Sequence, residues 1–340
     1  MKPTTGLGET FQYSNLMVAA GGYATAHAVA PALSLAAAYE TAMRQLVFAP
    51  IGMTSSTVSF PEGLAAEDRA WPHALAIDGV TRPIPPAIEG SIVAIAPAGG
   101  AWSNLHDMEQ YVMTELAGGI APNAKRVISP ANLRERWRQR VRSRAQGGYG
   151  VGMDVGTYQD LTAIGHTGGL FGFGTTMFML PEQGIGIVIL TNVRNGGDYE
   201  IFPFNEPVKR RILEEVFDGK PLASAMVDHF VRTRRDLVAA ALASIERDPD
   251  PAWVRGFSGT YVNASLGRVR ITAASRGGTF DVGEWKSDFA RKRDGDAATK
   301  LVLVDPPFAG GEPIIGGDEQ HPTLIVETGQ TKYVFERTGM

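Results

Sequence analysis

The chain has 340 residues, of which 44% are hydrophobic and 20% are charged, and it carries a net charge of −4 and no cysteine. These values are typical of one large or two ordinary globular domains, and they exclude a disordered chain and disulfide or thiol chemistry. The negative charge argues against nucleic acid as a partner. Residues 1–15 lack the apolar core of a signal peptide, and the compartment is left open.

The first predicted elements are two helices, over residues 16–30 and 34–48, which Pro31 separates. Ser34 is a suitable N-cap for the second helix. No charged residue occurs from Thr10 to Tyr39, a length that could span a membrane. Glycines and Pro31 interrupt this stretch and its alanines are weakly hydrophobic, so we expect a buried helix pair and no membrane span.

The middle of the chain alternates between irregular and helical patterns. Proline, glycine and small residues over 54–100 predict loops and short strands. A helical pattern restarts over 103–116, and Ser129 can cap a further helix that runs to about Val141. Arginine then recurs at every second position from Arg134 to Arg144. This spacing would spread the charges around a helix, and we interpret the stretch as solvated and not as a phosphate-binding site.

Strand-like patterns follow, in the runs 149–155, 161–167, 173–180 and 185–192. The turn sequence Pro-Glu-Gln-Gly joins the last two runs directly, which predicts an antiparallel hairpin.

Residues 205–248 read as helical, and the sequence Asp-Pro-Asp-Pro that ends at Pro251 breaks the chain. Beyond it, strand-like pieces recur without a sustained helical period. The segment 252–340 is therefore predicted to be a small all-β sheet or barrel.

Two short motifs could carry acyl-transfer chemistry, which requires a nucleophile, a base and donors for the oxyanion. The first is Tyr13-Ser14-Asn15, in which a phenol held ionised by nearby positive charge could act as a base and an amide could orient a substrate. The second begins at His166-Thr167 and continues with two glycines, in a strand that we expect to lie at a sheet edge. Backbone N–H groups on such an edge can bind a substrate as an added strand would.

Other kinds of site are not indicated. No set of His, Asp and Glu has metal-ligand spacing, and we expect neither a metal nor a cofactor. The glycine-rich run after His166 does not have the spacing of a dinucleotide fingerprint, and no Walker-type lysine motif occurs.

With their surroundings, these motifs resemble the serine β-lactamase-related group: class C β-lactamases, D-alanyl-D-alanine carboxypeptidases, D-aminopeptidases and related esterases. The similarity runs from about Gly6 to Asn192 and includes the segments VFAPIGMTSST, WPHAL, AIAPAGGAWSNLHDMEQYV and PEQGIGIVILTN. It implies an α+β fold: the antiparallel sheet and helices of a β-lactamase/transpeptidase-like domain, with its N-terminal part missing, followed by a small all-β barrel-like domain. The expected division is 1–204 for the partial β-lactamase-like domain, 205–250 for a helical connector and 251–340 for the C-terminal domain.

The resemblance also implies roles for individual residues. Tyr13 would take or relay the proton of the nucleophile, and Asn15 would orient the substrate. His166 would support the proton network of the tyrosine or hold a substrate carboxylate. Thr167 and Gly168 would line the substrate, and the N–H of Gly169 would form half of the oxyanion hole.

The first motif of the family, Ser-x-x-Lys, is absent, because no lysine in this chain has a serine three residues before it. Three accounts remain open: a hydrolase whose N-terminal segment is missing, one chain of a complemented protein, and a non-catalytic relative that binds a ligand or partner through a degenerate site. Ser14 as a substitute nucleophile is a further alternative. The sequence favours a serine hydrolase acting through an acyl-enzyme on a small molecule or peptide, and it does not decide between a D-amino peptide, a β-lactam and an ester.

Overall fold

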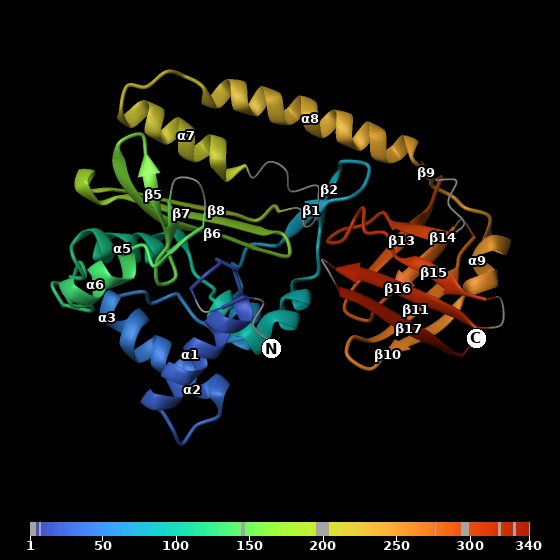
Figure 1. Cartoon of the computed structure of the whole chain (residues 1–340), viewed down its shortest axis with the longest axis horizontal. Coiled ribbons are helices and arrows are strands. Elements are labelled where there is room, and N and C mark those ends of the chain that lie inside the picture. Colours follow the sequence, from blue (N-terminus) through green and yellow to red (C-terminus); the bar gives the residue numbers. More distant parts are fainter. Residues whose placement is uncertain are drawn as a thin grey trace. The chain divides into compact units, whose positions relative to one another are not determined.

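The structure is a computed structural model that describes residues 5–6, 8–143, 147–194, 204–275, 277–293, 299–318, 321–328 and 331–339. It divides into two compact units (Figure 1). The helix–sheet unit comprises residues 1–69, 89–169 and 174–191, and the barrel unit comprises residues 70–88, 170–173 and 192–340. The division into domains 1–204, 205–250 and 251–340 stays a prediction.

The helices of the helix–sheet unit are α1 (Asn15–Val29), α2 (Leu35–Met43), the π-helical turn η1 (Arg44–Phe48), α3 (Ala49–Ile51), α4 (Phe60–Ala65), α5 (Leu105–Leu116) and α6 (Pro130–Trp137). The 3-10 segment η2 (Pro86–Ala98) precedes α5. The two N-terminal helices and the one over 103–116 are confirmed, whereas α4 and η2 lie in the segment that was predicted to hold loops and short strands. The N-terminal pair was expected to be buried, and that part was wrong: in α1 and α2 only alanines are buried, and Leu16 and Met17 are exposed.

Side-chain caps explain where these helices begin. Ser14, Ser34, Asn104 and Ser129 each accept a hydrogen bond from a backbone N–H one turn into the helix that follows. At the other end of a helix, Gly52 adopts a left-handed conformation with φ of 94° directly after α3. A left-handed residue there costs least when it is glycine, which explains the glycine in the Pro-Ile-Gly-Met sequence.

The arginine stretch is largely solvated, as predicted, since Arg134, Arg138, Arg140 and Arg142 are exposed. Helix α6 ends at Trp137, and Arg142 lies in the short strand β3. Arg136 is largely buried, pairs with Glu115 and donates to the Tyr111 hydroxyl at 2.7 Å. The helix that was predicted to run to about Val141 is therefore shorter, because an every-second spacing is also the period of a strand. Arg144 lies outside the described residues.

The sheet of this unit has the strand order β3-β4-β5-β6-β7-β8. The bounds are β3 (Val141–Arg142), β4 (Gly148–Tyr149), β5 (Asp154–Tyr158), β6 (Leu161–Leu170), β7 (Phe173–Leu180) and β8 (Ile185–Thr191). The hairpin β7–β8 is antiparallel, as predicted. Helix α5 packs on β8 at Gly186, where a Cβ atom would lie 2.2 Å from Cγ1 of Val112. The absence of a side chain at Gly186 therefore lets the helix approach the sheet.

The barrel unit contains the hairpin β1 (His73–Leu75) and β2 (Thr81–Pro83), the helices α7 (Asn205–Val216), α8 (Ala223–Ala243) and α9 (Pro251–Phe257), and the strand β9 (Ile245–Glu246). Its other strands are β10 (Gly259–Asn263), β11 (Gly267–Ala273), β12 (Gly278–Asp281), β13 (Lys286–Lys292), β14 (Thr299–Leu303), β15 (Ile314–Gly317), β16 (Pro322–Thr328) and β17 (Thr331–Gly339).

Strands β10 to β17 form a closed antiparallel barrel, because β12 pairs with both β11 and β13 (Figure 1). Its interior is filled by apolar side chains, among them the fully buried Tyr261, Ile271 and Leu324. The predicted small all-β barrel is confirmed. The sequence did not indicate α9, whose first turn is capped by Asp250.

None of the helices in the described parts of the chain is both long and apolar enough to cross a membrane.

Candidate active site

The Tyr13-Ser14-Asn15 motif forms the start of helix α1. Ser14 is the N-cap, with its Oγ 3.3 Å from the donating N–H of Met17, and Asn15 is the first helical residue. The Tyr13 side chain is 48% exposed, and Asn15 is also exposed. No hydrogen bond of the Tyr13 hydroxyl or of the Asn15 amide is recorded within the described ranges. Both groups are therefore available to a ligand.

His166 lies in β6 and uses both nitrogens of its ring. Nδ1 lies 2.6 Å from the carbonyl oxygen of Thr167, and Nε2 lies 2.9 Å from the hydroxyl of Tyr149. The structure also brings the ring of Tyr13 to His166, with a centroid distance of 6.3 Å. The two motifs, which are far apart in the sequence, therefore meet in the helix–sheet unit.

Tyr149 completes this cluster and was not predicted as a site residue. Its ring lies 6.1 Å from that of Tyr13 in an edge-on arrangement, 5.9 Å from that of His166 and 5.6 Å from that of Phe11. Burial, with smaller effects of Tyr13 and Asp154, raises the pKa of Tyr149 to about 12. The sequence marked Tyr149 only as part of a strand, and its side-chain partner could not be found from the strand pattern.

Strand β6, which carries the second motif, is an inner strand of the sheet, so its predicted position at the sheet edge was wrong. It lies between β5 and β7, and the register with β5 ends where Asp154 pairs with Gly165. Residues 166–170 therefore extend past the end of β5, and Thr167, Gly168 and Gly169 are exposed. The backbone of this extension can accept an added strand from a ligand.

Glycines hold β6 close to β7 beside this extension. A Cβ atom at Gly165 would lie 2.4 Å from the carbonyl oxygen of Met177, and one at Gly168 would lie 2.3 Å from Oγ1 of Thr175. A backbone atom cannot move aside as a side chain can, so Gly165 is the stricter of the two requirements. Gly165 and Gly168 therefore allow the close packing of β6 against β7.

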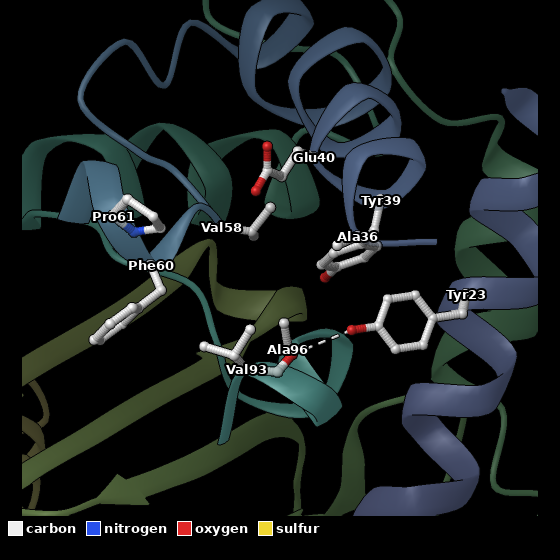
Figure 2. A pocket seen from close by; sticks show the side chains of 9 residues that line it. All are labelled: Tyr23, Ala36, Tyr39, Glu40, Val58, Phe60, Pro61, Val93 and Ala96. Carbon is white, nitrogen blue, oxygen red and sulfur yellow. Dashed lines mark hydrogen bonds between the residues drawn. The ribbon is translucent and has the colours of Figure 1, made fainter. Parts of the chain in front are cut away.

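A separate pocket of about 170 Å³ lies between α1, α2, α4 and η2 (Figure 2). Its lining is mostly apolar or aromatic: Tyr23, Ala36, Tyr39, Glu40, Val58, Phe60, Pro61, Val93 and Ala96. The Tyr23 hydroxyl donates to the carbonyl of Val93 at 3.2 Å, and burial raises the pKa of Tyr39 to about 12. A rise of 1.5 Å per helical residue puts Tyr23 about 12 Å along α1 from Asn15, so this pocket does not contain the two motifs.

The chemistry available at the motif cluster is proton transfer and hydrogen bonding. The phenols of Tyr13 and Tyr149 meet the imidazole of His166 beside the open backbone of β6, and Asn15 follows Tyr13 by two residues. No described histidine, aspartate and glutamate form a group of three that could hold a metal ion. Among the described residues, no ion pair of His166 is recorded. The motif residues could supply a base, an amide that binds the substrate and a donor for the oxyanion. The chain has no Ser-x-x-Lys motif that could add the nucleophile.

The sequence profile of the Beta-lactamase family matches residues 1–202. The chain therefore belongs to this family of β-lactamase-like hydrolases, and its antiparallel sheet and helices are those of the β-lactamase/transpeptidase-like fold.

Individual relatives are distant. The chain is similar to the protein called Unguisins hydrolase ungD' from Aspergillus campestris (strain IBT 28561), with 24% identity over 196 residues that cover 56% of this chain and 34% of that protein. Among solved structures, the octameric penicillin-binding protein homologue from Pyrococcus abyssi aligns with 97% of this chain and 66% of its own, at 16% identity and a TM-score of 0.49. The D-amino acid amidase from Ochrobactrum anthropi SV3, complexed with L-phenylalanine amide, aligns with 62% of this chain and 58% of its own, at 21% identity and a TM-score of 0.49. The chain thus spans about a third of the curated relative.

Proposed function

We propose that this chain supplies the proton-transfer and substrate-binding side of a serine hydrolase that acts through an acyl-enzyme. The bond cleaved would be an amide or ester, in a D-amino peptide, a β-lactam or a simple ester. The observation that carries this proposal is the meeting of Tyr13 with His166 beside the open end of β6. A nucleophilic side chain in acyl transfer needs a base that takes its proton and backbone groups that bind the substrate. Tyr13 would be the base, and the open end of β6 would align the substrate.

Each residue of the motifs has a place in this scheme. Tyr13, whose hydroxyl has no recorded partner among the described residues, would take or relay the proton of the attacking serine. Asn15 would orient the carbonyl or amide of the substrate. Thr167 and Gly168 would line the substrate, and the N–H of Gly169 would donate to the oxyanion. His166 would support the tyrosine network.

The nucleophile would come from a Ser-x-x-Lys segment outside the printed sequence. That segment could precede Met1 in the same polypeptide or belong to a complementing chain. Ser14 is a poor substitute, because its Oγ already accepts the hydrogen bond that starts α1 and no lysine or histidine lies near it in the sequence.

The DNA upstream of the codon for Met1 gives the first test, because an in-frame Ser-x-x-Lys would be expected there. The extended protein should then form a covalent adduct with a fluorophosphonate or a penicillin, which intact-mass spectrometry detects. Replacement of the new serine by alanine should abolish the adduct. If the extended protein is folded, keeps its Ser-x-x-Lys and still forms no adduct with either reagent or with an ester substrate, the hydrolase proposal is wrong.

A non-catalytic relative is the second candidate, and the absent Ser-x-x-Lys motif favours it. Such a protein would bind a ligand or a polypeptide at the open end of β6 without covalent chemistry. An upstream reading frame without Ser-x-x-Lys, together with failure of any complementing chain to restore adduct formation, would support this candidate over the first.

A further inference from the structure

Tyr149 makes a contact that neither sequence motif includes. It lies in β4, and its hydroxyl is 2.9 Å from Nε2 of His166 in β6. Strand β5 lies between them, with Asp154 paired to Tyr149 on one side and to Gly165 on the other. The sheet register therefore fixes where Tyr149 stands relative to the residue before His166.

The contact of Nδ1 of His166 indicates which ring nitrogen carries the proton. The carbonyl oxygen of Thr167, 2.6 Å from Nδ1, can only accept a hydrogen bond, so Nδ1 is the protonated nitrogen. In the neutral ring, Nε2 then has a free lone pair and can only accept. The Tyr149 hydroxyl is the donor that it meets.

The surroundings of Tyr149 favour this arrangement. Its phenol keeps its proton, because burial and the neighbouring Tyr13 and Asp154 raise its pKa to about 12. No other acceptor for the Tyr149 hydroxyl is recorded among the described residues. The Tyr149 hydroxyl therefore donates to Nε2 of His166.

We propose that Tyr149 is the positioning residue of this site: its hydroxyl donates to Nε2 of His166 and holds the ring in the tautomer that carries its proton on Nδ1. The description of His166 as a site residue rests on the proposed function, but its tautomer and its partner do not. Tyr13 is then left as the phenol of the cluster that is free to act on a substrate or nucleophile.

The test is a measurement of the histidine ring nitrogens in the full chain labelled with ¹⁵N-histidine, by long-range ¹H–¹⁵N correlation NMR at pH 7.5 (a value about one unit above the ordinary histidine pKa). The chain has only six histidines, and the His166→Asn variant identifies the signals of His166 by their loss. We expect a protonated Nδ1 and an unprotonated, hydrogen-bonded Nε2. This first readout needs no variant of Tyr149, so it decides the tautomer even if that variant does not fold.

Three tyrosine variants then identify the partner. Tyr149→Phe should shift the Nε2 resonance of His166, whereas Tyr13→Phe should leave it in place. Tyr158→Phe is the matched control, because Tyr158 lies in the same sheet and its ring contacts Phe178. A proton on Nε2 in the unaltered protein, or a Nε2 shift caused by Tyr13→Phe and not by Tyr149→Phe, would overturn the assignment. Since no catalysis is measured, failure here is distinct from failure of the hydrolase proposal.

Discussion

The rings of Tyr13 and His166 lie 6.3 Å apart at a tilt of 39°, and no hydrogen bond between them is recorded. The hydrogen-bonding capacity of the histidine is used instead by Thr167 and Tyr149. The family resemblance implies one proton network that contains both Tyr13 and His166, but the structure gives the two side chains different surroundings. Tyr13 is exposed and available for proton transfer, while His166 is held in place from the sheet.

Under the proposed function, Tyr13→Phe in a protein that carries a Ser-x-x-Lys segment should lower kcat/KM for an ester substrate by about 10²- to 10⁴-fold, the usual contribution of a general base. The substitution removes only the hydroxyl, so KM should change much less than kcat. Steady-state kinetics checks this result, with Tyr158→Phe as the control. Near-normal activity of folded Tyr13→Phe would show that another group takes the proton.

Ser14 should behave as a helix cap and not as a nucleophile. Ser14→Ala should lower the free energy of unfolding by about 1 kcal/mol, because it leaves a backbone N–H at the start of α1 unsatisfied. Ser34→Ala, at the cap of α2, should cost a similar amount. Urea denaturation measures both. Intact-mass spectrometry of the chain with a fluorophosphonate should show no adduct, and a label mapped to Ser14 would contradict the assignment.

Glu89 should make the stability of the protein depend on pH. Its side chain is buried without a recorded hydrogen-bond partner for either carboxylate oxygen in the described structure, and burial raises its pKa to about 7. The pKa of Glu89 is higher in the folded than in the unfolded state. The contribution of its protonated carboxyl to the free energy of unfolding is therefore complete below about pH 4.5 and is lost as the pH rises through about 7.

The Glu89→Gln variant should therefore be more stable than the unaltered protein at pH 8, by about 1–3 kcal/mol, and nearly equal to it at pH 4.5. Chemical denaturation at the two pH values checks the difference. Glu67→Gln, at an exposed glutamate, is the control and should show no such difference. An equal effect of Glu89→Gln at both pH values would mean that the carboxyl is solvated or paired.

The adjacent glycines of α1 should respond in opposite ways to alanine. A Cβ atom at Gly21 would meet no atom within 4 Å, so Gly21→Ala should stabilise the helix by about 1 kcal/mol. A Cβ atom at Gly22 would lie 2.4 Å from Cβ of Pro97, so Gly22→Ala should destabilise the protein by about 1–3 kcal/mol. Thermal unfolding of the two variants measures this, and a stabilised Gly22→Ala would show that η2 does not pack on α1.

Local patterns determined much of this protein from sequence. The cap at Ser34, the break at Pro31 and apolar periodicity predicted α1, α2 and α5, because these signals depend on a few neighbouring residues. The turn at 181–184 predicted the β7–β8 hairpin for the same reason. The motifs at Tyr13 and His166 were recognisable because their residue types follow one another directly in the chain. The missing Ser-x-x-Lys was equally visible.

Tertiary structure alone decided the rest. The register of β5 against β6 determines which backbone groups of the His166 strand are open, and pairing between strands is not encoded in either strand by itself. Tyr149 reaches His166 only because β4, β5 and β6 lie in that order, and Arg136 is buried only because Glu115 of another helix neutralises it. The chemical groups and their local backbone could therefore be read from the sequence. Their partners depended on long-range packing, which brings together residues that no local pattern relates.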